Sequence, residues 1–318
     1  MSERNHKLDS LKGFLIITVV LGHILGDGSQ DVLNKYCRMF IYTFHMPLFI
    51  LISGYFTKIK DNTIAFWKGL LNIATPLCVF QIISVLLIYL NNGTINKSML
   101  IIPYWTLWYL LSLIFWKIIL QYSSQRLLNQ PLLYMIIAIV VSVFSGLFPF
   151  ERILSIQRTL NFFPFFLFGF YLKTKKIIFP NLKWEKLVYV CLIIVNLILI
   201  LFDLYPEKQS ILLKGADSYT ISDIPAKFYM IICAFIVSIS FFKIFKENKM
   251  LAHIGQDSIF YYLYHGLIIE FILQPIIIYY GLPNSFFCML LYTIIILGMI
   301  FIMCKMKLFR KIVNPFIC

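Results

Sequence analysis

Long apolar stretches follow one another along nearly the whole chain, and they limit its possible fold more than any other feature of the sequence. A helix needs about 20 mostly apolar residues to cross the hydrocarbon core of a bilayer. Hydrophobic types make up 60% of the 318 residues and charged types 13%, which is more apolar side chain than a water-soluble domain can hide. The sequence therefore predicts an all-α integral membrane protein, a bundle of about ten transmembrane helices in one domain over residues 1–318. The candidate spans are residues 8–25, 40–56, 64–90, 99–120, 132–148, 153–172, 187–204, 224–245, 258–280 and 283–308.

The distribution of basic residues predicts the orientation of these spans. Lysine and arginine total 28, against 14 acidic residues. If the N-terminus is cytoplasmic and each span crosses the bilayer, 20 of the 28 basic residues fall on the inner side, as the positive-inside rule requires. We therefore expect both termini in the cytoplasm of a multi-pass cell-membrane protein, with residues 1–26 retained as the first span rather than cleaved as a signal peptide. Membrane topology explains the basic balance without a nucleic-acid partner.

Motifs of several soluble enzyme classes are absent from the sequence. The seven cysteines show neither CxxC nor Cys/His spacing, so we predict no metal site and no disulfide framework. There is no GxxxxGK[ST] phosphate loop, no GxGxxG and no GxSxG, which argues against nucleotide hydrolysis and serine-hydrolase chemistry. The candidate functional groups are instead the ionisable side chains inside the spans, because these are costly to place in a bilayer.

The first span carries three such side chains. Lys12 and His23 are eleven residues apart, which places them on one stripe of a helix, about 16 Å apart along its axis. Lys12 then lies near the cytoplasmic end and His23 lies toward the outer leaflet, while Asp9 is close enough to pair with Lys12. Two interpretations stay open for each basic residue. Lys12 either binds a ligand or extends its amine to the membrane surface, and His23 is either catalytic or bonds a neighbouring carbonyl group.

The second span runs back toward the inside, which places His45 at a depth similar to that of His23. Two imidazoles at one depth on adjacent spans could share a cavity. Met46 and Pro47 follow His45 directly. Proline inside a helix is expected to loosen the helix and to free backbone groups that neighbours must satisfy.

The later spans contain further polar candidates. His265 and Glu270 lie in the ninth span, where ligand binding and hydrogen bonding between helices are both open interpretations. Arg158 interrupts the apolar sixth span and either faces lipid headgroups or orients an anionic or polyhydroxyl substrate. Trp108 and Tyr109 belong either to an interfacial aromatic belt or to a substrate path.

Several stretches together resemble one family. LDSLKGFLIITVVLGH is similar to the opening signature of the membrane-bound acyltransferase-3 family, an Asp-x-x-Arg followed, after ten intervening residues, by His. FHMPLFILISGYF resembles the second-span signature, and IGQDSIFYYLYHG resembles the late Gly-x-x-Ser…Tyr-Leu-x-His element. TLWYLLSL and RTLNFFPFFLFGFYL are similar to further elements in the expected order. The resemblance covers nearly the whole chain and is nearest to the stand-alone fucose 4-O-acetylase-like branch.

This resemblance implies transfer of an acetyl group from cytoplasmic acetyl-CoA to a hydroxyl of a cell-surface or exported carbohydrate. His23 would be the general base, and His45 would assist as a donor to the developing oxyanion. Direct transfer and an acetyl-histidine intermediate both stay open.

Ligand contacts follow from the same resemblance and from the charge distribution. Lys12 stands where the family usually has Arg, which keeps the charge but loses bidentate recognition of phosphate. The acyl donor would be held by Lys12, Asp9 and Lys58, and the acceptor would be contacted by Arg158, Trp108, Tyr109 and His265.

Two other classes of function remain open on the sequence. Buried histidine, arginine and glutamate would also suit a proton-coupled transporter or flippase for a glycan or lipid-linked sugar. Such carriers often show internal repeats, and no repeat is evident here. A receptor or assembly protein is the other alternative, although it would not need two histidines at matched depth.

Overall fold

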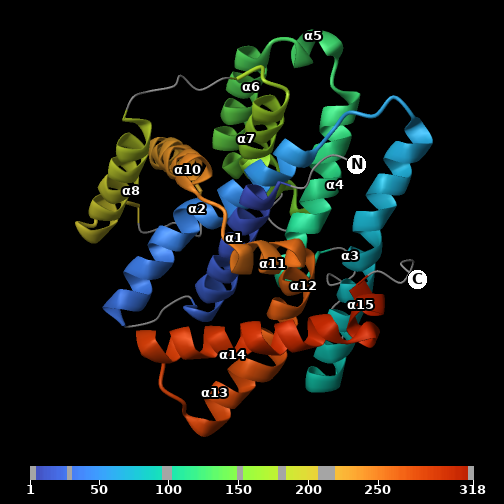
Figure 1. Cartoon of the computed structure of the whole chain (residues 1–318), viewed down its shortest axis with the longest axis vertical. Helices are drawn as coiled ribbons and strands as arrows, with labels where there is room; N and C mark the ends of the chain where they lie inside the picture. The colour runs from blue at the N-terminus through green and yellow to red at the C-terminus, as the bar shows by residue number, and fades with distance from the viewer. Residues whose placement is uncertain are drawn as a thin grey trace. The chain divides into compact units, whose positions relative to one another are not determined.

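The structure is a computed structural model that describes residues 5–26, 31–94, 102–148, 153–177, 184–206 and 219–313. Within these residues every regular element is a helix, which confirms the predicted all-α class (Figure 1). The longer helices are α1 (His6–Ile24), α2 (Val32–Phe56), α3 (Thr63–Asn92), α4 (Trp108–Tyr122), α6 (Pro131–Phe144), α7 (Ile156–Lys173), α8 (Glu185–Leu201), α10 (Ile224–Ile244), α12 (Ser258–Ile268) and α14 (Phe286–Lys305). The shorter elements are η2 (Trp105–Leu107), α5 (Gln125–Leu128), η3 (Ser145–Leu147), η4 (Ile153–Ser155), η5 (Ile221–Asp223), α11 (Lys249–Gln256), η6 (Ile269–Leu273), α13 (Gln274–Tyr280) and α15 (Lys307–Val313).

Five helical segments in the described part of the chain are long and apolar enough to cross a bilayer. They correspond to the second, third, eighth, ninth and tenth predicted spans. Helix α1 carries Lys7, Asp9 and Lys12 near its start, and α8 has only 17 residues. Several apolar helices and little charge fit a membrane protein. The count of ten spans and the cytoplasmic position of both termini stay predictions. The predicted span 99–120 begins outside the described residues.

The chain divides into two compact units. The first contains Met1–Tyr42, Leu71–Leu107 and Phe245–Cys318, and the second contains Thr43–Leu70 and Trp108–Ile244. Helices α2 and α3 each contribute residues to both units. The single domain over residues 1–318 remains a prediction.

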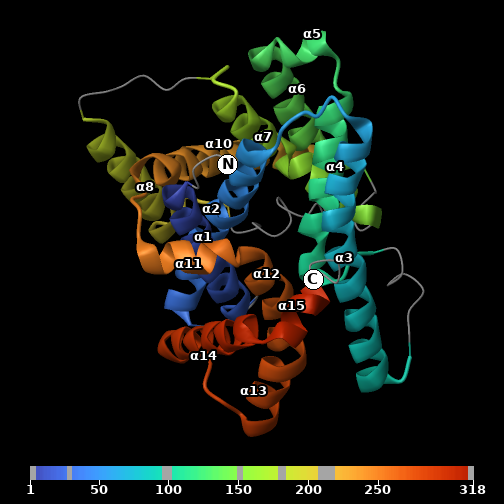
Figure 2. The ribbon, with the colours of Figure 1, turned by 45° about the vertical axis from the view of Figure 1, so that its right-hand side comes forward.

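Two glycines hold the first unit together where α1 crosses α11, and the two helices lie side by side in both views (Figures 1 and 2). A Cβ atom on Gly13 would lie 2.0 Å from the carbonyl oxygen of Leu251, and one on Gly255 would lie 1.8 Å from that of Asp9. Only glycine lets the two backbones approach this closely. Small residues at helix crossings are the usual packing device in membranes, because lipid supplies no hydrophobic force between helices.

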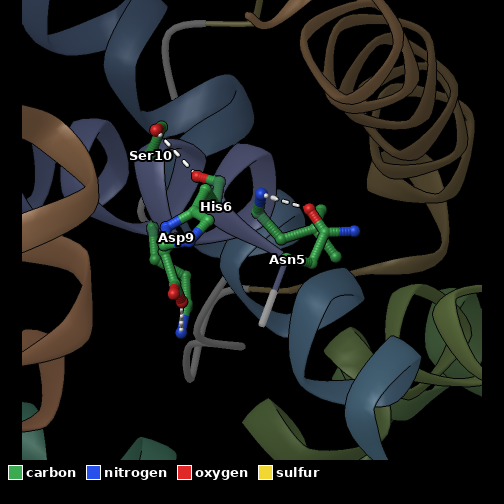
Figure 3. A network of polar contacts seen from close by, with 6 residues as sticks. Asn5, His6, Asp9 and Ser10 are labelled. Carbon is green, nitrogen blue, oxygen red and sulfur yellow. Dashed lines mark hydrogen bonds and ion pairs between the residues drawn. The ribbon is translucent and has the colours of Figure 1, made fainter. Parts of the chain in front are cut away.

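Polar contacts reinforce the same crossing. The Ser10 hydroxyl lies 2.8 Å from the carbonyl of His6, the contact drawn in Figure 3, and 2.9 Å from that of Asn248. The backbone N–H of Asn248 donates in turn to the Ser10 oxygen. Asn248 also begins α11, because its side chain accepts a hydrogen bond from the N–H of Leu251. Asn5 begins α1 in the same way.

The second unit uses the same device where α2 crosses α7. A Cβ atom on Gly54 would lie 1.9 Å from the carbonyl oxygen of Phe166 on α7. A Cβ atom on Gly169 would lie 1.9 Å from the carbonyl oxygen of Leu51 on α2. Pro47 and Pro164 lie inside these two helices, yet both helices continue past them. Helix α2 is therefore continuous through Pro47, and the expectation that this proline loosens the helix stays a prediction.

Replacing Gly255 with alanine tests the first crossing. We expect the added methyl group to lower the free energy of unfolding by about 1–3 kcal/mol, because it meets backbone that cannot move aside. Thermal unfolding of the detergent-solubilised chain measures this loss. Gly298→Ala is the matched control, because nothing lies within 4 Å of a Cβ atom there, and alanine favours a helix. Equal midpoint temperatures for the two variants would contradict the packing argument.

Candidate functional site

The side chain of His23 lies among aromatic rings near the C-terminal end of α1. Its ring centroid is 4.9 Å from the ring of Trp105, 5.4 Å from that of His265 and 6.5 Å from that of Tyr42. These three rings come from η2, α12 and α2. His23 itself is half-buried. The first unit therefore brings two predicted site residues, His23 and His265, into one aromatic cluster.

The chemistry of His265 follows from its single described hydrogen bond. The residue is completely buried, and its Nδ1 lies 3.0 Å from the carbonyl oxygen of Tyr261. A carbonyl oxygen can only accept, so Nδ1 carries the proton and Nε2 of the neutral ring keeps its lone pair. In the described part of the chain Nε2 has no hydrogen-bond partner. A buried acceptor without a partner is costly, which marks this nitrogen as a position for a ligand donor.

Trp105 was not predicted as a site residue. Its backbone has φ 34°, a left-handed conformation that is strained for a bulky side chain. Tyr262 donates a hydrogen bond to the carbonyl oxygen of Thr106 and so fastens the strained segment to α12. Gly266 on α12 permits this approach, because a Cβ atom there would lie 2.9 Å from the Thr106 hydroxyl. Such strain is found mainly where a side chain must be held in one place.

The helix after His265 changes its winding. Residues Ile269–Leu273 form a π-helical turn between α12 and α13. Pro275 lies in the first turn of α13 and cannot donate a backbone hydrogen bond, so a wider turn before it avoids the usual clash. Glu270 lies on this turn, is exposed, and its carboxylate is close enough to act on the Tyr104 hydroxyl. Glu270 thus lies beside the segment that carries Trp105.

Asp9 and Lys12 form the ion pair that their spacing predicts. The Lys12 Nζ lies 2.6 Å from an Asp9 carboxylate oxygen, and Figure 3 shows the Asp9 end of this contact. Asp9 is buried and Lys12 half-buried. Both residues share the unbroken helix α1 with His23. Lys12 is therefore neutralised by a neighbour, whereas its role in binding an acyl donor stays a prediction.

Two of the predicted acceptor contacts meet in the second unit. The Arg158 guanidinium lies over the ring of Trp108, 5.3 Å from its centroid, and Trp108 stacks on Phe162. Leu154 and Ser155, just before α7, both have positive φ. This arrangement is a cation and an aromatic face in contact, a combination that suits binding of a polar ring.

The other predicted residues of the second unit are placed differently from one another. Tyr109 is buried, with its hydroxyl 2.6 Å from that of Ser53, and its contact with the acceptor stays a prediction. His45 is buried within α2. Its match in depth to His23 stays a prediction. Lys58 is exposed just beyond the end of α2.

Comparison with known proteins matches almost the entire chain. The family described as "Acyltransferase domain", the acyltransferase-3 family, matches residues 5–304. The chain is 30% identical over 194 residues to "Nodulation protein NolL" of Sinorhizobium fredii (strain NBRC 101917 / NGR234), which covers 53% of this chain and 49% of that protein. The match thus spans about half the length of this curated relative. No solved structure matches.

Replacing Tyr262 with phenylalanine tests how the Trp105 segment is held. The carbonyl group of Thr106 would lose its donor, and a buried unsatisfied carbonyl costs about 1–3 kcal/mol. We therefore expect faster hydrogen exchange at the amide of Leu107, which closes this turn onto Tyr104. Tyr292→Phe removes a comparable bond to Pro283 and is the control. An unchanged exchange rate at Leu107 in the Tyr262 variant would show that the bond does not hold the segment.

Proposed function

The chain belongs to the acyltransferase-3 family, and from that premise we propose that it is a membrane O-acetyltransferase. The acetyl donor is cytoplasmic acetyl-CoA, and the acceptor is a hydroxyl group of a cell-surface or exported carbohydrate. His23 is the general base. The observation that carries this proposal is the contact of the His23 ring with Trp105 and His265 inside a chain of this family.

The reaction needs one proton acceptor and one stabilised oxyanion. His23 removes the proton of the acceptor hydroxyl while the oxygen attacks the thioester carbonyl carbon. The tetrahedral oxyanion then collapses, the carbon–sulfur bond breaks, and the CoA thiolate takes the proton from the His23 imidazolium. His45 serves as the oxyanion donor in this scheme. The products are the acetyl ester and free CoA, so protons and charge balance without a further reactant.

The aromatic cluster supplies what a sugar acceptor requires. Carbohydrates bind through flat apolar faces and a few fixed hydrogen bonds, which is the general pattern of small-molecule sites. Trp105 offers such a face, and the bare Nε2 of His265 accepts a hydrogen bond from a sugar hydroxyl. The Arg158–Trp108 pair in the second unit is a second contact for the acceptor.

The acyl donor would approach from the cytoplasmic side. The predicted inner side holds 20 of the 28 basic residues, which would concentrate an anionic donor there. Lys12, Asp9 and Lys58 are the proposed donor contacts. Because Asp9 already neutralises Lys12, Lys12 orients the acyl donor more than it attracts it by an uncompensated positive charge. A carbohydrate acceptor is what the resemblance to fucose 4-O-acetylase-like proteins implies.

Replacing His23 with alanine tests the proposed function. We expect acceptor-dependent release of CoA from acetyl-CoA to fall by about 10²–10⁴-fold, because a general base contributes a factor of this size. The measurement uses the full chain in lipid nanodiscs, with a thiol-reactive dye and with candidate glycans present or absent. His253→Ala is the matched control, because His253 is exposed and touches none of the cluster residues described above.

A second variant distinguishes loss of chemistry from loss of folding. His23→Gln retains a polar side chain of similar length but cannot act as a general base. Thermal unfolding is measured for both variants. Release within about tenfold of wild type in a folded His23 variant would overturn the role of this residue. Glycan uptake without CoA release would favour the transporter instead.

His265→Asn separates the two nitrogens of the second imidazole. The asparagine amide can still donate to the Tyr261 carbonyl group, but the lone pair at the position of Nε2 is lost. We expect the KM for the acceptor to rise about tenfold while the KM for acetyl-CoA is unchanged, because one acceptor hydrogen bond is removed. A KM for the acceptor equal to that of wild type would show that Nε2 does not contact the sugar.

A further inference from the structure

Three lysines converge on a small hollow at the end of α2 in the second unit. Lys58 and Lys60 follow α2, and Lys117 reaches the same place from α4. The hollow encloses about 40 Å³ and is lined in addition by Thr57, Gln121 and Gly69. Lys58 and Lys60 are exposed, and Lys117 is half-buried. We refer to these six residues as the basic pocket.

The backbone of the basic pocket is fixed by hydrogen bonds. The Gln121 side chain holds Lys60 twice, accepting from its N–H at 3.0 Å and donating to its carbonyl oxygen at 2.8 Å. Thr57 donates to the carbonyl of Ser53 and accepts from the Lys117 amine at 3.4 Å. The pocket is therefore a built feature of the fold, and the Lys117 amine is held in it by a hydrogen bond.

The Lys60 amine is held in one position in this pocket. It donates to the carbonyl of Ala65 at 2.7 Å. A Cβ atom on Gly69 would lie 3.1 Å from the same amine, so glycine at this position leaves room for it. The charge of Lys60 acts directly on Lys117. Two ammonium groups that repel each other are thus held together by the surrounding structure.

The pocket carries no compensating acid among the residues that the structure describes. None of the three lysines forms an ion pair there, whereas Lys243 of the same unit pairs with Glu185 at 3.3 Å. Asp61 follows Lys60 in the sequence and also forms no ion pair with the three. A half-buried, uncompensated ammonium group is unfavourable, and a bound anion would relieve both its desolvation and the repulsion.

We infer that the basic pocket binds a phosphate group. Lysine binds phosphate as a point charge without needing planar geometry, and the hollow fits one small group rather than an extended chain. The pocket lies on the predicted cytoplasmic side, where phosphates come from soluble cofactors or from anionic lipid headgroups. That the acyl donor supplies the phosphate rests on the proposed function, whereas binding of phosphate itself does not.

A binding experiment tests the inference without using catalysis. The full chain is placed in nanodiscs of neutral phosphatidylcholine and titrated with CoA, with pantetheine, which lacks the phosphates, and with inorganic phosphate as competitor. We expect CoA to bind more tightly than pantetheine and to be displaced by phosphate. Lys117→Gln and Lys60→Gln should each weaken CoA binding about tenfold, by loss of one charge contact. Lys117→Arg should restore most of it.

A control variant and a change of lipid show whether the effect is specific to the pocket and which molecule supplies the phosphate. Lys186→Gln removes an exposed lysine of the same unit and should change nothing. If the headgroup is the ligand, nanodiscs containing phosphatidylglycerol will weaken CoA binding to wild type but not to the Lys60/Lys117 double variant. Unchanged affinity for CoA and no lipid effect in folded glutamine variants would overturn the inference. His23→Ala should still bind CoA, so loss of transfer and loss of phosphate binding are distinguishable.

Discussion

The close crossing of α1 and α11 at Gly13 and Gly255 is the contact on which the first unit depends. His23 lies ten residues beyond Gly13, and His265 lies ten residues beyond Gly255. The two imidazoles thus lie equally far along the chain from the crossing, and their ring centroids are 5.4 Å apart. A side chain at either glycine would separate the backbones and move one histidine relative to the other, so packing about 15 Å away sets the geometry of the site.

Much of this site could be predicted from the sequence, because polar residues inside apolar spans stand out against their surroundings. The spacing of Asp9 and Lys12 predicts their ion pair, and the isolation of His23 and His265 in apolar stretches marks them as candidates. Trp105 could not be found in this way, because its importance lies in a strained backbone that only tertiary contacts impose. In the sequence it is one aromatic residue among many.

The predicted sixth span shows that a helix can continue through polar residues that break its apolar pattern. Gln157, Asn161 and Pro164 interrupt the apolar pattern, yet α7 is continuous and these residues are buried. Asn161 accepts a hydrogen bond from Ser145 at 2.7 Å, and Gln157 donates to the carbonyl of Phe148. These side chains face other helices rather than lipid, where their hydrogen bonds hold the second unit together. A hydropathy count gives the number of polar residues in a span but not whether their side chains face other helices or lipid.

Charge compensation separates the lysines that stabilise the fold from those available to a ligand. Lys12 is neutralised by Asp9, and the buried amine of Lys227 lies over the ring of Tyr219 and 3.4 Å from the Ser145 hydroxyl. Lys117 has only the Thr57 hydroxyl among the described residues and faces the charge of Lys60. Each ammonium group loses hydration on leaving water, and the first two recover part of that loss from the protein itself. The third recovers little within the described chain, so an anion from outside contributes most at Lys117.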